Sequence, residues 1–179
     1  MSVFLQPIYT QTIGNSTTTE ITFNNIPQSF TDLKMVVSGR DISTSGINGA
    51  VLGFKVNGDA STNNLYSATA LKGTGSGTTS DRATSAQFFA IPYITNPSYT
   101  SNTFASIEFY LPNYTGSNFK SWTIDGVTEN NATAANQILV AGLYRSTSAV
   151  TSVSFYDAGG SYYFAQTNTT FTLYGITKG

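Results

Sequence analysis

The feature that most constrains the fold is a two-residue alternation of apolar and polar side chains, which recurs along the chain. Such alternation predicts β-strands that bury one face and expose the other. The clearest alternating runs are residues 21–23, 33–37, 52–56, 105–111, 121–125, 153–155 and 171–173. A more continuously apolar run, Ile138 to Tyr144, predicts a strand that is covered on both faces. No segment has the apolar spacing of a helix longer than a turn or two.

Turn residues separate these runs. The dipeptides Asn57-Gly58, Asp125-Gly126 and Gly159-Gly160 predict turns or bulges, and the glycine-rich stretch Gly73–Ser80 predicts a flexible loop. No stretch has the length of a domain linker. We therefore expect residues 1–179 to form a single all-β domain. The expected fold is an antiparallel β-sandwich, jelly-roll-like, of about eight to ten strands.

The first fourteen residues allow two interpretations. They hold a group of apolar side chains ahead of Gly14, namely Val3, Phe4, Leu5, Ile8 and Tyr9. Residues 1–14 are therefore either an N-terminal arm that anchors the protein to a partner or an ordinary first strand.

Composition excludes several classes of function. The chain has no histidine and no cysteine, which removes the usual general base, the thiolate nucleophile and most zinc ligands. Lysine and arginine number only eight and are scattered, whereas phosphate binding needs clustered basic residues. No apolar run approaches the ~18 residues of a membrane helix, and Met1–Pro7 lacks the start of a secretory signal. We expect no cofactor, metal, nucleic acid or membrane partner.

Carboxylates are the remaining candidates for catalysis. A glycosidase needs two carboxyl groups about 5–9.5 Å apart, and Glu108 with Asp125 or Glu129 could supply them. The alternative interpretation is solvated surface charge, paired with Lys120. We favour the alternative, so that the sequence predicts a protein that is not an enzyme.

A set of aromatic residues gives the candidate binding sites. Trp122 is expected in the core, whereas Tyr110, Tyr114, Tyr162 and Tyr163 are candidates for the surface. Tyrosine is enriched at subunit interfaces, and its ring can also stack on a sugar. The tyrosines are therefore either interface residues or glycan-facing residues.

Three stretches together carry a resemblance to a known family. They are Ile21–Pro27 with Phe30–Arg40, Pro112–Ser121, and Phe171–Ile176. From about residue 21 to residue 176, the chain resembles small virion proteins of tailed bacteriophages, common in cyanophages and marine phages. Proteins of this family are described as virion structural, head-decoration or tail-fibre-associated proteins. The resemblance assigns no functional residues.

The resemblance implies a virion structural protein on the surface of the phage particle. The expected role is a capsid decoration or cement protein, a homotrimer that binds the major capsid protein and stabilises the head. The alternative is a tail-fibre or baseplate module that binds a receptor or a host glycan.

Overall fold

The structure is a computed structural model, and it describes residues 4–14, 18–42, 50–60, 65–86, 89–129, 135–158 and 168–177. This part of the chain contains strands and no helix. The strands are β1 (Phe4–Ile13), β2 (Glu20–Phe23), β3 (Asp32–Gly39), β4 (Ala50–Val56), β5 (Tyr66–Gly73), β6 (Thr78–Ala86), β7 (Phe89–Ile94), β8 (Ala105–Pro112), β9 (Lys120–Val127), β10 (Gln137–Tyr144), β11 (Val153–Asp157) and β12 (Thr169–Thr177). All the predicted strands are present, and β5, β6 and β7 were not predicted.

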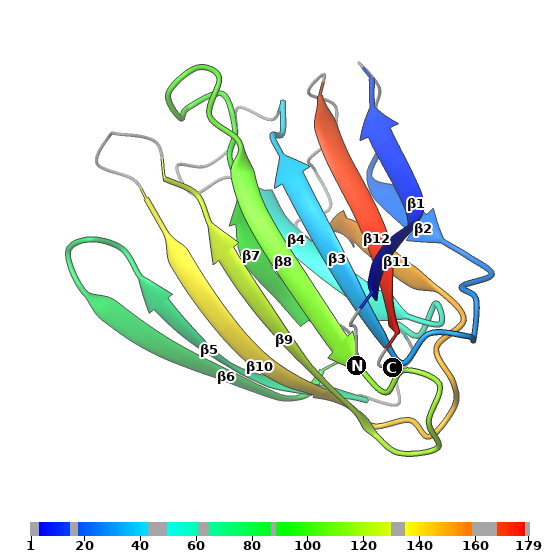
Figure 1. The fold of residues 1–179 in the computed structure, drawn as a ribbon. Helices are drawn as coiled ribbons and strands as arrows, with labels where there is room; N and C mark the ends of the chain where they lie inside the picture. Colours follow the sequence, from blue (N-terminus) through cyan, green and yellow to red (C-terminus); the bar gives the residue numbers. More distant parts are fainter. Residues whose placement is uncertain are drawn as a thin grey trace.

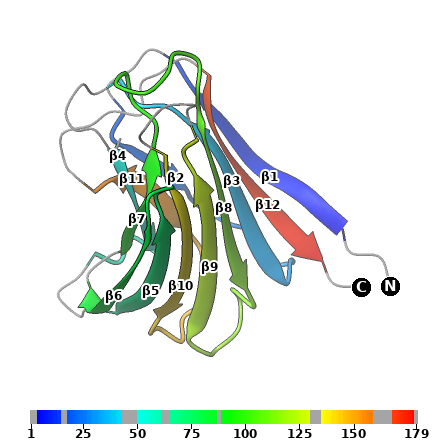
Figure 2. The ribbon, with the colours of Figure 1, turned by 90° about the vertical axis from the view of Figure 1, so that its left-hand side faces the viewer.

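The strands form two antiparallel sheets that lie face to face. The large sheet has eight strands in the order β1-β12-β3-β8-β9-β10-β5-β6, and the small sheet has four in the order β2-β11-β4-β7. Figure 1 shows the large sheet in front of the small one, and Figure 2 shows the two layers from the side. The predicted all-β sandwich is confirmed, with more strands than expected.

The strand pairing is that of a jelly roll. β1 pairs with β12, β2 with β11, β3 with β8, and β4 with β7, all antiparallel. The two halves of the chain therefore run side by side like one long hairpin that is rolled into two sheets. Two further strand pairs, β5–β6 and β9–β10, extend the large sheet beyond β8. These added strands create the part of the large sheet on which the candidate site lies.

The core lies between the two sheets. Burial alternates strictly along β9, because one of its faces is turned to the small sheet and the other to solvent. Near the centre, the ring of Phe54 on β4 lies 4.7 Å from that of Phe109 and 4.8 Å from that of Trp122. Trp122 is buried, which confirms its predicted place in the core.

One predicted turn is wrong. Asp125-Gly126 lies inside β9, where Gly126 is paired with Ile107 on β8 and with Ile138 on β10. Strand partners on both sides supply the hydrogen bonds that a turn would otherwise make. Tertiary pairing therefore outweighs the local preference of this dipeptide.

The turn predicted at Asn57-Gly58 is confirmed. Asn57 and Gly58 both have positive φ, 54° and 67°, and the amide of Asp59 donates to the carbonyl of Val56 at 2.9 Å. This turn carries the chain from the small sheet toward the large one. The predicted loop Gly73–Ser80 is shorter than expected, since β6 already begins at Thr78. Gly159-Gly160 lies outside the described residues.

The prediction that β10 is covered on both faces is also wrong. Its outward-facing side chains Leu139 and Ala141 are exposed, because the small sheet covers only the opposite face. The outer face of the large sheet therefore carries exposed apolar side chains.

Residues 4–13 form an ordinary first strand, one of the two expected alternatives. β1 is the edge strand of the large sheet and pairs only with β12. Ile8 and Tyr9 pack against the core, whereas Phe4 and Leu5 are 68% and 51% exposed. Val3 lies outside the described residues.

Candidate functional site

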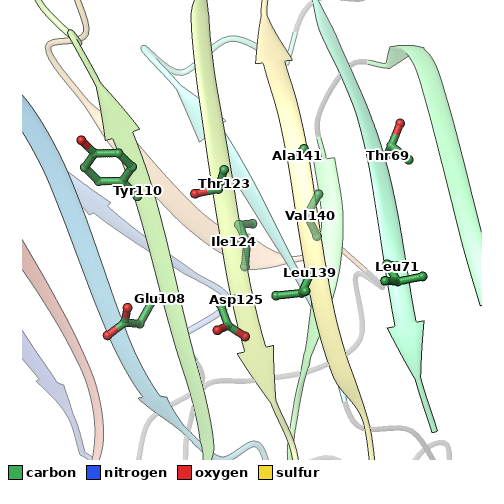
Figure 3. A pocket seen from close by; sticks show the side chains of 10 residues that line it. All are labelled: Thr69, Leu71, Glu108, Tyr110, Thr123, Ile124, Asp125, Leu139, Val140 and Ala141. Atoms are coloured by element: carbon green, nitrogen blue, oxygen red, sulfur yellow. The ribbon is translucent and has the colours of Figure 1, made fainter. Parts of the chain in front are cut away.

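The outer face of the large sheet, which is turned away from the small sheet, carries a groove across β8, β9, β10 and β5. The strand registers place Glu108, Asp125, Leu139 and Leu71 in one row across these four strands. A second row beside it holds Tyr110, Thr123, Ala141 and Thr69. These eight side chains, together with Ile124 and Val140, line a cavity of about 500 Å³ (Figure 3). We call the eight outward-facing side chains the outer groove.

The outer groove continues along the strands in both directions. A smaller depression of about 150 Å³ adjoins it at Leu71 and Leu139 and reaches toward the β5–β6 turn. Another of about 310 Å³ adjoins it at Thr69, Thr123 and Ala141. The hollow surface is therefore longer than the row of residues at its centre.

Two carboxylates lie side by side at the β8–β9 end of the groove. Glu108 and Asp125 are directly opposite each other, and like charges in this relation destabilise a sheet. The ammonium group of Lys34 lies 2.8 Å from the Glu108 carboxylate and offsets that charge. Within the described part of the chain, the side-chain carboxylate of Asp125 forms neither a hydrogen bond nor an ion pair. The groove therefore has one uncompensated negative charge at Asp125.

A cation also lies at the opposite rim. Arg82 on β6 donates to the hydroxyl of Thr69 at 3.4 Å. The guanidinium contacts Thr69, which lies two strands across and two residues along from Asp125. At ~4.8 Å per strand and ~3.4 Å per residue the separation is about 12 Å, which exceeds the screening length of about 8–10 Å in ordinary salt. Arg82 therefore does not neutralise Asp125.

Among the described residues, Tyr110 is the one predicted tyrosine that lines the groove. Its hydroxyl donates to Oδ2 of Asp32 at 2.6 Å. Burial, together with the neighbouring Asp32 carboxylate, raises the pKa of Tyr110 to about 12. The hydroxyl is thus engaged within the protein, and the half-buried ring faces the groove only in part.

The prediction that Tyr114 faces a partner is wrong. Tyr114 is fully buried in the core, and its hydroxyl donates to the carbonyl of Pro27. The segment after β8 looks like a surface turn in the sequence, yet the ring of Tyr114 folds back between the sheets. Tyr162 and Tyr163 lie outside the described residues.

The predicted pairing of the surface carboxylates with Lys120 is also wrong. Lys120 is buried, and its ammonium group donates to the carbonyls of Gly116, at 2.6 Å, and Asn118. Burial lowers the pKa of Lys120. Glu108 is paired with Lys34 instead.

The arrangement of carboxylates gives little support to catalysis. Glu108 is ion-paired, and its side chain is 54% exposed, whereas a glycosidase acid lies in a buried, apolar site. Within the described ranges, no three acidic side chains come close enough to hold a metal ion. The same ranges contain no helix that could span a membrane.

The sequence did not predict the two leucines of the groove. Leu71 belongs to β5, whose buried residues include the small Ala68 and Ala70, so its apolar alternation is weak. The continuous apolar run from Ile138 to Tyr144 predicts that Leu139 lies in a strand that is covered on both faces. The sequence feature that could have revealed both residues is a leucine at an outward-facing position of the strand, where a polar side chain is usual.

Comparisons of this chain with protein-family models, with curated proteins and with solved structures found no match.

Proposed function

We propose that the protein is a structural protein of a phage virion, a decoration protein on the head that binds the major capsid protein as a homotrimer. The resemblance of residues 21–176 to phage virion proteins motivates this proposal. The jelly-roll pairing is compatible with it, because jelly rolls recur in viral capsid and lectin domains. The proposal assigns the protein no catalytic activity.

One observation carries the proposal. Three large apolar side chains point outward on neighbouring strands of the large sheet, Leu71, Leu139 and Val127, with 51%, 45% and 39% exposure. Single exposed apolar residues are ordinary, but contiguous ones mark interaction surfaces. Protein interfaces combine such an apolar centre with a polar rim, and carboxylates and threonines line the same groove as Leu71 and Leu139.

A decoration protein of this kind would stabilise the head through many equal contacts. An interface of ~1,200–2,000 Å² is sufficient for specific binding, and repetition over a particle adds avidity. A second contact would come from the start of β1, where Phe4 and Leu5 are exposed. This contact would give an anchoring role to the start of β1, although residues 4–13 form a strand and not a free arm.

Localisation on intact particles tests the proposal. An antibody against the protein, viewed by electron microscopy, should label the whole head surface. Label confined to the tail would contradict the decoration role and favour the receptor-binding alternative. Particles without label would contradict a virion role altogether. Light scattering of the purified protein tests the trimer, and a monomer at micromolar concentration would argue against it.

The glycan-binding alternative has weaker support. It relied on exposed aromatic rings, and of the four tyrosines proposed for it only Tyr110 lies on the described surface. Tyr110 is half-buried, with its hydroxyl held by Asp32.

A further inference from the structure

We propose that the outer groove binds an extended peptide segment that carries a lysine or arginine and, two residues away, an apolar side chain. In this arrangement the cation lies at Asp125, and the apolar side chain lies over Leu139 and Leu71. Leu139 and Leu71 also belong to the apolar surface of the proposed function, so this inference rests on that proposal and names the kind of segment that the partner presents.

Charge complementarity supports the cationic residue. Asp125 and Glu108 face each other across β8 and β9, and Lys34 pairs with only one of them. A second cation placed at Asp125 would relieve the repulsion between the two carboxylates. An anionic partner would increase it.

The apolar half of the groove supports the second residue. Leu139 and Leu71 are directly opposite each other on β10 and β5, and both are about half exposed. Their midpoint lies about 7 Å from Asp125 at ~4.8 Å per strand. Side chains two residues apart in an extended peptide are also separated by about 7 Å. A basic residue and an apolar residue with one residue between them therefore match the row.

The groove fits other ligand classes less well. Binding of a sugar ring or of an unpaired nucleobase relies on exposed aromatic rings. Among the described residues of the groove, the one aromatic ring is that of Tyr110, which is half-buried. Two adjacent carboxylates oppose the phosphates of a nucleic acid. The aliphatic stem of lysine or arginine, in contrast, can lie along the leucines while its charged end reaches the carboxylates.

Amide NMR with blocked synthetic peptides tests the proposal. A peptide of sequence Ser-Lys-Ser-Leu-Ser should give saturable shifts at the amides of β9, β10 and β5 that border the groove. The peptides Ser-Glu-Ser-Leu-Ser and Ser-Lys-Ser-Ser-Ser should each bind more weakly. High salt should remove the preference for lysine over glutamate, because the charge pair is exposed.

Variants of the protein localise the two halves of the interaction. Asp125→Asn should weaken binding of the lysine peptide about two- to fivefold, the usual range for an exposed ion pair. Leu139→Ser should weaken it about tenfold, through lost apolar contact. Lys34→Met should strengthen binding, since it frees the Glu108 carboxylate for the peptide.

Matched controls lie outside the groove. Glu20→Gln removes an exposed carboxylate of the small sheet that is paired with Lys55, and Leu5→Ser removes an exposed leucine of β1. Both should leave peptide binding unchanged.

Three results would overturn the proposal. The first is equal binding of the lysine and glutamate peptides at low salt, or the absence of shifts at the groove. The second is a response of the same amides to maltotriose in place of the peptides, which would make the groove a sugar site. The third is dissociation of an oligomer by Leu139→Ser, which would mean that a second copy of the chain covers this face.

Discussion

Because Gly142 has no side chain, the ring of Trp122 can occupy the space beside its Cα atom. The two residues are directly opposite each other on β10 and β9, and a Cβ atom on Gly142 would lie 2.0 Å from Cζ2 of Trp122. Because the indole lies across the neighbouring strand, it can reach Phe54 on the small sheet, with which it forms an edge-to-face pair 4.8 Å apart between ring centres. The glycine thus allows the largest core side chain to join the two sheets.

Gly142→Ala should therefore displace Trp122 and destabilise the sandwich by about 1–3 kcal/mol, the usual cost of overpacking a core. Urea unfolding measures the loss, and a change in tryptophan fluorescence reports the displaced ring. Gly73→Ala is the control, since a Cβ atom there meets nothing within 4 Å. Equal stability of the two variants would show that the ring does not need the glycine.

Tyr66 connects the two sheets through its hydroxyl group. The hydroxyl accepts from the amide of Val56 at 2.9 Å and donates to the carbonyl of Asp59 at 3.0 Å. Tyr66→Phe should cost about 1–3 kcal/mol in the free energy of unfolding, because the buried amide loses its partner. Tyr9→Phe, which removes an exposed hydrogen bond of 3.3 Å, should cost much less. A Tyr66→Phe variant as stable as the Tyr9→Phe control would contradict this prediction.

The raised tyrosine pKa values predict loss of stability in alkali. The pKa of Tyr110 is about 12 in the folded protein, and burial raises the pKa of Tyr66 as well, whereas an unfolded tyrosine titrates near ~10. Between these values the unfolded chain binds fewer protons than the folded protein, so stability falls as the pH rises. The urea midpoint should drop between about pH 10 and about pH 12, and less steeply in Tyr110→Phe. A midpoint that stays constant over this range would refute the prediction.

The buried ammonium of Lys120 holds the turn between β8 and β9. It donates to the carbonyls of Gly116 and Asn118, and charged hydrogen bonds of this kind contribute about 1.5–3 kcal/mol. Lys120→Met should therefore lower the free energy of unfolding by about 2–3 kcal/mol. Lys34→Met breaks only a surface ion pair and should cost at most about 1 kcal/mol. A Lys120 variant no less stable than this control would show that the carbonyls find other partners.

The exposed start of β1 can be tested without removing the strand. Replacing Phe4 and Leu5 together by serine should leave folding intact, because both side chains are exposed, yet weaken co-sedimentation with particles that lack the protein. Phe119→Ser is the matched control, since Phe119 is a similarly exposed aromatic residue. Undiminished co-sedimentation of the Phe4 and Leu5 variant would sink the anchoring role.

The alternation of side chains along the sequence predicted the strands correctly where large apolar residues alternate with polar ones. β8 and β9 are of this kind, and their inward-facing residues, such as Phe109 and Trp122, are those that the alternation predicts. The prediction failed where small residues fill the buried positions, as Ala68 and Ala70 do in β5. Small side chains bury little apolar area, so they leave a weak periodic signal.

The sequence by itself determined the all-β class, the sandwich and the lack of histidine and cysteine chemistry. These follow from side-chain type and from spacing along the chain. Only the tertiary structure decided that Asp125, Leu139 and Leu71 lie in one row, because β5 joins β10 from a distant part of the chain. It also decided that Lys120 is inside and Leu139 outside. The physical reason is that strand register and the extent of the covering sheet are set by long-range pairing, which no local spacing encodes.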